Sequence, residues 1–540
     1  MNAKSVAIRQ VLRNHVFLYL LAGFLLFATC LLHFWNLENM PGGVHVDESS
    51  VAYNAYCIYK TGADEHGTKY PLFFKCFGNY QDPVMIYSAV PMAGLFGLDK
   101  AAIRFLSALF HILASVALFF LVSKLIRNRM ICLVSAFTFS VLPWLFPISR
   151  TGIGGYMAML LGIIGGCYFL FDAIGRKSTV SSVLAGIFWS FAMYSHHIGK
   201  PMSAVILTCF VLALNKRIMK RLKVFSVFMA SFAFLLVPMA ISSLIRPESM
   251  TSRFNSIALW RESSTWIEIA TGMLQRYIEY FSFDFLFIAG DRDLRHNVGA
   301  GELYLFFVPL LVAGVYVIVK NFKGNPFYRF IFLCLLTYPA AAVLTISHYH
   351  STRCMNGAPF WCIAAAIGLN YFCQERKKYA VVLIAVILLA TFEIPSYMSR
   401  YFGRYQIDSR ESFSAGSIEA IQKSIGHLGK DETLYISRYM FFPEEMKPGF
   451  KPEFYTNILF LAKIDPVVYQ REGLPKEKVR LYDEEFDRPG IFLTLDSLYL
   501  LDENNNLRIS RDFEKRPGKL KLIERIPTPS GINFEIYRVY

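Results

Sequence analysis

Charged residues are missing from long stretches of this 540-residue sequence, and their absence excludes an ordinary soluble protein. The first such stretch, 16–35, contains no Asp, Glu, Lys or Arg. An α-helix rises about 1.5 Å per residue, so a block of this length crosses the roughly 30 Å hydrocarbon layer of a membrane. Similar blocks follow along the chain, and they hold most of its 54% hydrophobic residues. The composition therefore predicts a polytopic α-helical membrane protein.

Several recognisable motifs are also missing. No Walker or Rossmann pattern occurs, and the glycines at 152, 154 and 155 follow no predicted strand, so a nucleotide-binding loop is excluded there. No small-residue cleavage site follows the first apolar block, which is therefore not a cleavable signal. No repeat or low-complexity tract is present.

Cysteine is scattered rather than clustered. None of the ten cysteines lies beyond Cys373, and most fall inside apolar blocks, where a thiol acts as a small hydrophobic group. Only Cys57 and Cys76 share one predicted external loop, where a disulfide could form. No compact Cys/His signature is found. The His348-x-His350 spacing could suit a metal, but hydrogen bonding at the membrane interface is the favoured interpretation.

The net charge of +15 is confined to the apolar part of the chain. From residue 398 onward the sequence has 22 basic and 22 acidic residues, which leaves 33 basic and 18 acidic residues before it. Membrane orientation explains this excess without a polyanionic partner, so no nucleic-acid binding is predicted.

Eleven apolar segments are long enough to be interpreted as membrane spans. If the N-terminus is cytoplasmic, 19 basic residues fall in the cytoplasmic segments, as the positive-inside rule requires. The predicted spans are 16–35, 103–123, 130–147, 155–173, 180–195, 200–214, 224–244, 303–319, 327–347, 357–373 and 379–397.

The same alternation places three segments on the extracytoplasmic side. These are a first external loop (36–102) and a second (245–302) within a transmembrane domain of residues 1–397, and a C-terminal domain of residues 398–540. In the first loop, 49–59 predicts an amphipathic helix that ends at Gly62. The apolar segments 83–98 and 260–287 are predicted to lie in the membrane interface.

The C-terminal domain differs in character from the rest. Its charges are dense and balanced in sign, and a helix-like segment (411–428) is followed by strand-like segments at 433–437, 490–501 and 534–539. This pattern predicts a soluble extracytoplasmic α/β domain.

Two adjacent carboxylates, Asp47 and Glu48, stand at the head of the predicted amphipathic helix in the first external loop. A carboxylate beside the membrane could serve as a general base for an acceptor hydroxyl. The alternative is a helix N-cap, in which an acidic side chain accepts free backbone N–H groups.

Basic residues at the extracytoplasmic boundary run against the overall charge bias. A departing phosphate gains negative charge, which Arg stabilises well through its paired N–H groups. Arg150 and Arg353 lie at predicted span ends, where a membrane-bound phosphate would lie. The alternative for each is an interface anchor. The full set is Lys69, Lys75, Arg104, Arg150, Lys200, Arg292, Arg295 and Arg353.

The first external loop resembles that of the bacterial lipid-carrier-dependent glycosyltransferases of the GT-C superfamily, which include protein O-mannosyltransferases and aminoarabinose transferases (glycosyltransferase family 39 type). The shared pattern is a span, an Asp-Glu pair, a Gly-Asp-type turn, a Pro-containing stretch, an interfacial helix and an Arg that opens the second span. Here these are Asp47-Glu48, Gly62-Ala63-Asp64, Tyr70-Pro71, 83–98 and Arg104. Looser likeness continues at 147–150, 291–296, 350–353 and 413–420.

By this resemblance Asp47 would be the catalytic base, and Glu48 would orient the acceptor or help to hold a divalent cation such as Mg²⁺, Mn²⁺ or Zn²⁺. The aminoarabinose transferases have Lys-Pro where this chain has Asp82-Pro83, so Asp82 is a second metal candidate. The substrate-binding residues implied are Asp64, Lys69, Asp82, Arg104, Arg150, Arg295, His350 and Arg353.

The predicted function is an inverting glycosyltransferase of the plasma membrane, with a cytoplasmic N-terminus. It would move a sugar from a polyprenyl-phosphate carrier to an acceptor hydroxyl on a glycan, lipid or protein outside the cell. A lipid-linked donor would also explain why no nucleotide motif is present. The alternative is a surface-polysaccharide polymerase or ligase, or a transporter of lipid-linked glycans. A transporter would be expected to carry charges at mid-membrane, where these spans are nearly uncharged.

Overall fold

The structure is a computed structural model that describes residues 3–260, 264–437, 455–475, 477–482, 486–496, 498–501, 507–510, 520–528 and 533–540. Its contacts divide the chain into two compact units. The membrane unit comprises residues 1–37, 104–151 and 155–405. The loop–domain unit comprises residues 38–103, 152–154 and 406–540. The predicted division at residue 397 stays a prediction.

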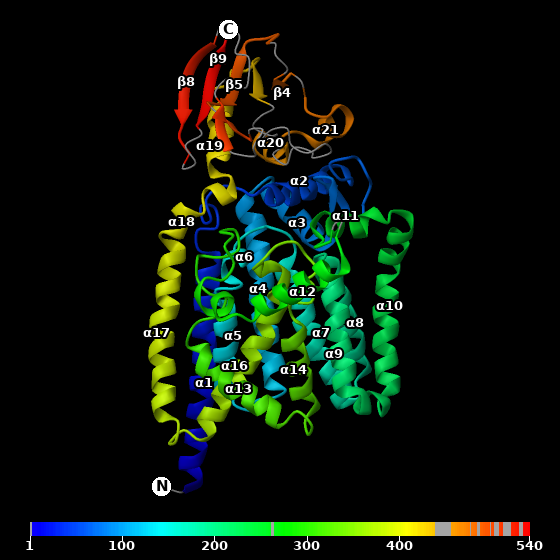
Figure 1. The fold of residues 1–540 in the computed structure, drawn as a ribbon, viewed down its shortest axis with the longest axis vertical. Coiled ribbons are helices and arrows are strands. Elements are labelled where there is room, and N and C mark those ends of the chain that lie inside the picture. Colours follow the sequence, from blue (N-terminus) through cyan, green and yellow to red (C-terminus); the bar gives the residue numbers. More distant parts are fainter. Residues whose placement is uncertain are drawn as a thin grey trace. The chain divides into compact units, whose positions relative to one another are not determined.

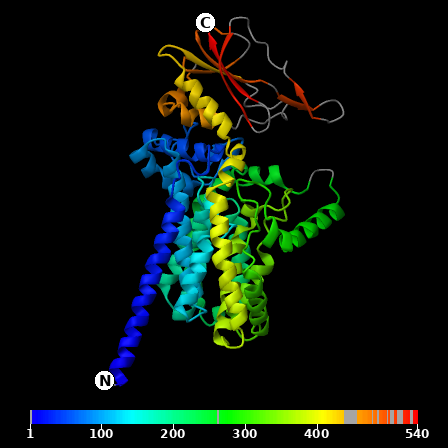
Figure 2. The same cartoon turned by 90° about the vertical axis from the view of Figure 1, so that its left-hand side faces the viewer.

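The membrane unit is built from long apolar helices that run side by side (Figures 1 and 2). Each of the eleven predicted spans contains one helix, which confirms the polytopic helical architecture. The helices are α1 (Ala3–Phe34), α4 (Lys100–Ser123), α5 (Arg129–Ser140), α7 (Tyr156–Arg176), α8 (Thr179–Ser195), α9 (Gly199–Met219), α10 (Leu222–Ile245), α13 (Phe307–Lys320), α14 (Pro326–Thr337), α16 (Ala358–Gln374) and α17 (Ala380–Phe402).

Six of these helices, α1, α4, α7, α9, α10 and α17, are long and apolar enough to cross a membrane. Two of the shorter ones end early for a clear reason. The predicted span 130–147 is helical only to Ser140, and 327–347 only to Thr337. Pro143 and Pro339 follow within three residues. Proline supplies no backbone N–H and disfavours helical geometry in the residue before it, so the apolar chain continues there as turns.

Shorter helices connect the long ones within the membrane unit. A helix from 266 to 280 begins at Thr265, which forms a capping box with Glu268. The predicted aromatic segment 260–287 is therefore helical over only part of its length. The connecting elements are α6 (Phe146–Ser149), α11 (Glu248–Ile257), α12 (Trp266–Tyr280), η1 (Asp284–Ile288), α15 (Ser351–Cys354) and η2 (Met355–Gly357).

The loop–domain unit begins with the predicted amphipathic helix. It spans Val46–Thr61 (α2) and ends at Gly62 in the left-handed conformation, as predicted. A short hairpin of β1 (Phe74–Cys76) and β2 (Asn79–Gln81) leads to α3 (Pro83–Phe96). The later helical elements are α18 (Tyr405–Asp408), η3 (Glu411–Phe413), α19 (Ala415–Gly426), α20 (Tyr455–Leu461) and α21 (Pro466–Glu472).

A five-stranded mixed sheet forms the C-terminal part of this unit, in the order β4-β3-β5-β9-β8. β3 pairs in parallel with β4 and β5, whereas β9 pairs antiparallel with β5 and β8. The predicted strands at 433–437 and 534–539 are confirmed, and 490–501 forms two strands. The strands are β3 (Thr433–Ser437), β4 (Val479–Tyr482), β5 (Gly490–Leu495), β8 (Leu520–Ile526) and β9 (Phe534–Val539), with a separate pair β6 (Leu498–Leu501) and β7 (Leu507–Ser510).

One hydrophobic core joins α2 to the C-terminal sheet. Tyr53 and Cys57 of α2 are buried among Ile421, Leu434 and Ile491. Hydrogen bonds fix the contact, because the Tyr53 hydroxyl donates to the carbonyl of Ile464 at 3.1 Å. The helix that carries the adjacent acids is therefore held by residues some 400 positions later in the chain.

The disulfide considered for Cys57 and Cys76 is absent from the structure. Both are buried free thiols. The Sγ atom of Cys76 lies 2.9 Å from the Ser50 hydroxyl and 3.7 Å from the Tyr455 hydroxyl, so it acts as a polar partner inside the loop–domain unit.

Candidate active site

The first turn of α2 is capped by His45, not by either acid. The Nδ1 atom of His45 accepts the backbone N–H of Asp47 at 3.1 Å. Glu48 completes the capping box, because its Oε2 atom accepts the backbone N–H of His45 at 2.9 Å. The N-cap alternative considered for the acidic pair therefore applies to Glu48 and leaves Asp47 out.

Both carboxylate oxygens of Glu48 accept backbone hydrogen bonds. Its Oε1 atom accepts the N–H of Gly152 at 2.7 Å. The residue is only 1% exposed. Glu48 is therefore a firmly positioned carboxylate whose two oxygens are already engaged by backbone N–H groups.

Asp47 differs from its neighbour in each respect. Its side chain is 36% exposed, and Oδ2 lies 3.5 Å from Nδ1 of His45. No other polar contact to this carboxylate is found among the described residues. Since α2 is anchored to the C-terminal sheet through a shared hydrophobic core, Asp47 is an accessible carboxylate on a rigid support, which is what a general base requires.

The other predicted charged residues of the first loop differ in their surroundings. Asp64 is buried, and its Oδ1 atom accepts the backbone N–H groups of His66 and Thr68 at 3.0 and 2.8 Å. This closes a turn. Asp82 is half-buried at the N-cap position of α3 and makes no side-chain capping bond there. Lys69 is exposed.

Two of the arginines predicted to bind substrate instead donate to backbone carbonyls at or just after the end of α1 in the membrane unit. Arg150 is fully buried, and its Nη atoms donate to the carbonyls of His33 and Trp35 at 2.8 and 2.6 Å, with Leu32 as a third acceptor. These carbonyls lie at the end of α1, where helical acceptors are otherwise unsatisfied. Arg104 donates to the carbonyl of Leu37 at 2.9 Å. The anchor alternative therefore describes both residues well.

Arg353 is placed differently. It is 8% exposed, and the one hydrogen bond found for its side chain among the described residues runs from Nη1 to the Thr345 hydroxyl at 2.7 Å. Burial lowers the pKa of Arg353, and the positive charge of Arg253 acts in the same direction. The guanidinium of Arg353 has further N–H groups that can donate hydrogen bonds to an anion.

Arg353, Lys200 and Arg253 form what we call the cationic group. Burial and then the charges of His196, Lys200, Arg253 and Arg353 hold the pKa of His197 well below its usual value. The same happens at His196, where Lys200 and Arg253 follow burial as causes. Three permanent cations thus converge on one pair of stacked imidazoles, whose centroids are 3.9 Å apart. Such an arrangement favours an anionic ligand.

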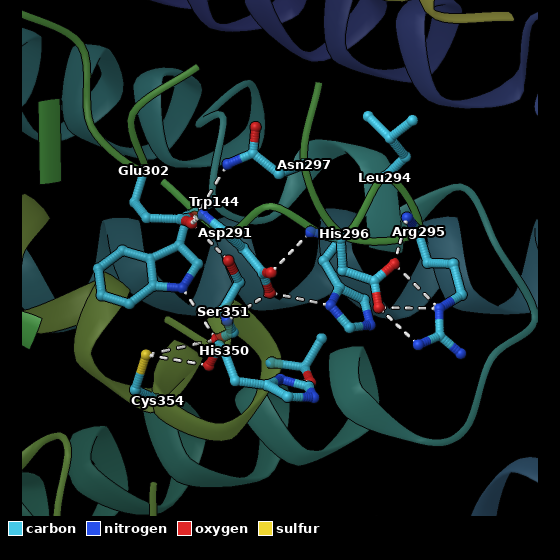
Figure 3. Close-up of polar contacts among 12 residues, drawn as sticks. Trp144, Asp291, Leu294, Arg295, His296, Asn297, Glu302, His350, Ser351 and Cys354 are labelled. Atoms are coloured by element: carbon cyan, nitrogen blue, oxygen red, sulfur yellow. Dashed lines mark hydrogen bonds and ion pairs between the residues drawn. The ribbon is translucent and has the colours of Figure 1, made fainter. Parts of the chain in front are cut away.

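A polar network surrounds Asp291 in the segment that precedes α13 (Figure 3). Glu302 is buried, and its Oε1 atom accepts the backbone N–H of Asp291 at 2.9 Å and the Ser351 hydroxyl. Burial raises the pKa of Glu302 to about 8. Gly290 turns the chain here at φ +65°, and a Cβ atom would lie 2.3 Å from the Asn297 side chain. The network fixes the backbone that carries Asp291.

Asp291, His296 and His350 lie together in this network. Oδ2 of Asp291 lies 3.0 Å from Nδ1 of His296, and the imidazoles of His296 and His350 are 4.9 Å apart between centroids. Their potential ligand atoms all lie within 4.8 Å of one another. His348 is not part of the cluster and instead pairs with Glu279 at 2.8 Å.

Arg295 pairs with Asp293 in the same segment and is partly exposed. Hydrogen bonds and charge from Arg295 and His296 overcome burial and hold the pKa of Asp293 well below its usual value. Sequence reasoning gave Arg295 and His350 as substrate-binding residues and missed the grouping with Asp291. It also missed Arg253, which lies in the unpredicted helix α11.

Comparison with solved structures identifies the fold. ArnT from Cupriavidus metallidurans bound to undecaprenyl phosphate superposes with a TM-score of 0.54 and 12% identity, over 95% of this chain and 97% of that one. The Archaeoglobus fulgidus oligosaccharyltransferase in complex with Zn and sulfate gives 0.52 and 13%, over 82% of this chain and 61% of that one. The chain has the GT-C fold.

A further archaeal structure, AglB from Archaeoglobus fulgidus with an inhibitory peptide and a dolichol-phosphate, gives a TM-score of 0.50 and 11% identity over 94% of this chain and 75% of that one. No protein-family model matches the sequence, and no curated protein matches it. The GT-C likeness therefore rests on the arrangement of the chain, and with the apolar helices it makes this an integral membrane protein.

Proposed function

We propose that this GT-C protein transfers a sugar from a polyprenyl-phosphate carrier to an acceptor hydroxyl, with inversion at the sugar C1 atom. The observation that carries the proposal is the contrast between two adjacent acids. Glu48 is locked by two backbone N–H groups, whereas Asp47 is accessible and lacks a capping role. The fold is shared with structures that hold undecaprenyl phosphate and dolichol-phosphate, which supports a lipid-phosphate donor.

Asp47 is proposed as the general base. The acceptor hydroxyl attacks C1 of the sugar while its proton passes to an Asp47 carboxylate oxygen. The bond between C1 and the phosphate oxygen breaks, and the electron pair leaves with polyprenyl phosphate. A positioned base of this kind contributes about 10²–10⁴-fold to the rate.

The cationic group is proposed to bind the carrier phosphate. The leaving phosphate gains a negative charge as C1–O bond cleavage proceeds, and fixed positive charges stabilise that change. Arg353 has donor capacity left, and Lys200 and Arg253 bring two further charges. We therefore assign the phosphate to Arg353, Lys200 and Arg253 in preference to Arg150, whose guanidinium caps α1.

An apolar cavity in the membrane unit could take the lipid tail. It has a volume of about 470 Å³ and lies among α8, α9 and α10. On α9 it is lined by Ala204, Leu207 and Val211, which follow Lys200 at intervals of four, three and four residues. Such spacing puts the four side chains on one helix face. A cation at the end of an apolar stripe matches a phosphate attached to a hydrocarbon chain.

The experiment is a transfer assay with purified protein in liposomes, supplied with radiolabelled polyprenyl-phosphate sugars and a membrane extract as acceptor source. Sugar transfer with equimolar release of polyprenyl phosphate is expected, and Asp47→Asn should lower both about 10²–10⁴-fold. A transporter would move labelled donor across the bilayer with no free carrier phosphate, and a ligase would require a lipid-diphosphate donor. Either result would contradict the proposal.

The extracytoplasmic location of the chemistry is part of the proposal and follows from the distribution of basic loops. Single cysteines introduced at exposed Lys69 and at Arg376 should be labelled by an impermeant maleimide from opposite faces of sealed vesicles. Labelling of Lys69→Cys from the cytoplasmic face would exclude a donor presented outside.

A further inference from the structure

We infer that Asp291, His296 and His350 form a binding site for a divalent transition metal, with Zn²⁺ as the best match. The three groups come from the segment before α13 and from the residue that precedes α15. Their potential ligand atoms lie within 4.8 Å of one another. These three residues are different from Glu48 and Asp82, the two metal candidates that the sequence suggested.

The donor set selects the class of metal. Two imidazoles and one carboxylate are typical of zinc sites that leave a fourth position open. Mg²⁺ and Ca²⁺ prefer sites made entirely of oxygen ligands. At a tetrahedral centre with metal–ligand bonds of about 2.1 Å, the ligand atoms lie about 3.4 Å from one another. The most widely separated ligand atoms, which lie within 4.8 Å of one another, therefore need to close by up to about 1.4 Å.

The surrounding hydrogen bonds orient the ligands. Oδ1 of Asp291 accepts the backbone N–H of Asp293 at 2.9 Å, and Oδ2 accepts that of Ser351 at 2.8 Å. Nδ1 of His350 lies 3.1 Å from the Thr352 hydroxyl, which leaves its Nε2 atom for a ligand. Figure 3 shows the imidazoles of His296 and His350 next to each other, with Asp291 beside His296. Such outer contacts normally fix metal-ligating side chains.

The charge balance indicates what completes the site. Arg353 follows His350 by three residues in the same short segment. With one carboxylate ligand and a neighbouring Arg353, a bound dication leaves net positive charge. We therefore expect an anionic oxygen, from hydroxide or from a phosphate, at the open position.

The test measures metal rather than turnover. Full-length protein purified without chelator should contain about one zinc per chain by mass spectrometry. His296→Ala and His350→Ala should each lower zinc binding more than tenfold, whereas His348→Ala, a histidine two residues from the site, should leave it unchanged. Metal-free protein titrated with Co²⁺ should develop the visible absorption of a tetrahedral site, and His350→Ala should not.

A folding defect is separated from loss of a ligand by two further measurements. Added Zn²⁺ should raise the thermal midpoint of metal-free wild-type protein but not that of His296→Ala or of the milder Asp291→Asn. Asp47→Asn should keep its zinc while losing sugar transfer, so that the metal inference and the proposed function can fail independently. Wild-type protein that takes up no more Zn²⁺ or Co²⁺ than His296→Ala would overturn the inference.

Discussion

The Oε1 atom of Glu48 accepts the backbone N–H of Gly152 at 2.7 Å, although the two residues are 104 positions apart. Glycine is required at that position, because a Cβ atom would lie 2.6 Å from Cγ2 of Ile103 and 3.4 Å from Cγ of Glu48. The same carboxylate closes the capping box of α2. Glu48 therefore joins the start of α2 to the segment at Gly152 through one buried side chain.

Glu48→Gln should destabilise the protein while leaving the position of Asp47 largely intact. The amide replaces one acceptor oxygen with an N–H donor, which then faces the N–H of either His45 or Gly152. An unmade buried hydrogen bond costs about 1–3 kcal/mol. Thermal unfolding in detergent should show a lower midpoint for Glu48→Gln and for Gly152→Ala. Equal midpoints for both variants and wild type would contradict the positioning role.

Asp47→Asn should have the opposite effect to Glu48→Gln: the protein should stay stable but lose activity. Among the described residues the Asp47 carboxylate has one partner, at 3.5 Å, so the free energy of unfolding should stay within about 0.5 kcal/mol of wild type. Sugar transfer should fall about 10²–10⁴-fold because the base is lost. Glu38→Gln is the matched control, since Glu38 is an exposed acid whose partner is Lys100 at 3.5 Å. Retained turnover in Asp47→Asn would remove this residue from the chemistry.

Substitutions of Arg353 and Arg150 should have different effects, the first on donor binding and the second on stability. Arg353→Ala should raise the KM for the lipid donor about 10- to 150-fold, the equivalent of one charge-assisted hydrogen bond of about 1.5–3 kcal/mol. Arg150→Ala should instead lower the thermal midpoint and the yield of folded protein, because three carbonyls at the end of α1 lose their donor. The reverse pattern would move the phosphate to Arg150.

The sequence predicts the membrane helices well because hydrocarbon imposes one dominant rule, apolar runs of spanning length. Positions 433–437 and 534–539 were predictable as strands because their β-branched and aromatic residues lie between turn-forming residues. The helix breaks at Ser140 and Thr337 could have been found from Pro143 and Pro339. The spans were predicted from hydrophobicity alone, so they extended beyond these two prolines.

The candidate site was less accessible to sequence reasoning. Asp47 and Glu48 look equivalent in sequence, and only the backbone of Gly152, far along the chain, distinguishes them. Asp291 and His350 are separated by 59 positions, so no local spacing links them. Arg253 lies in a loop helix with no motif. In each case the partner is set by tertiary packing, which no local pattern encodes.

Filling the apolar cavity should raise the KM for lipid-linked sugar donors with long tails more than for those with short tails. Leu207→Trp adds bulk to the stripe that continues from Lys200. It should raise the KM several-fold for long polyprenyl donors and leave a short, water-soluble prenyl donor unaffected. Leu212→Ala, which enlarges the same cavity, is the companion variant and should not impair long donors. An equal effect of Leu207→Trp on both donors would place the tail elsewhere.

Glu65 should make the stability of the loop–domain unit depend on pH. It is buried, its Oε1 atom accepts the Tyr455 hydroxyl at 2.7 Å, and its Oε2 atom has no partner among the described residues. Burial, the largest cause, raises its pKa to about 7. The unfolded chain releases this proton near its ordinary value of 4.5. The folded state therefore holds more protons between these values, and stability should fall as pH rises from about 4.5 to about 7 and then level off.

Glu65→Gln should remove that decline, with a gain of up to ~3 kcal/mol above about pH 7, as the pKa difference implies. Thermal midpoints measured from about pH 5 to about pH 8 would show it. Tyr455→Phe is the more specific test. The Tyr455 hydroxyl stabilises the ionised carboxylate of Glu65, so its removal should raise the pKa of Glu65 further and extend the decline in stability to higher pH. If wild type and Glu65→Gln lose stability in parallel over this range, another group governs the titration, and Glu65 is ionised inside the fold.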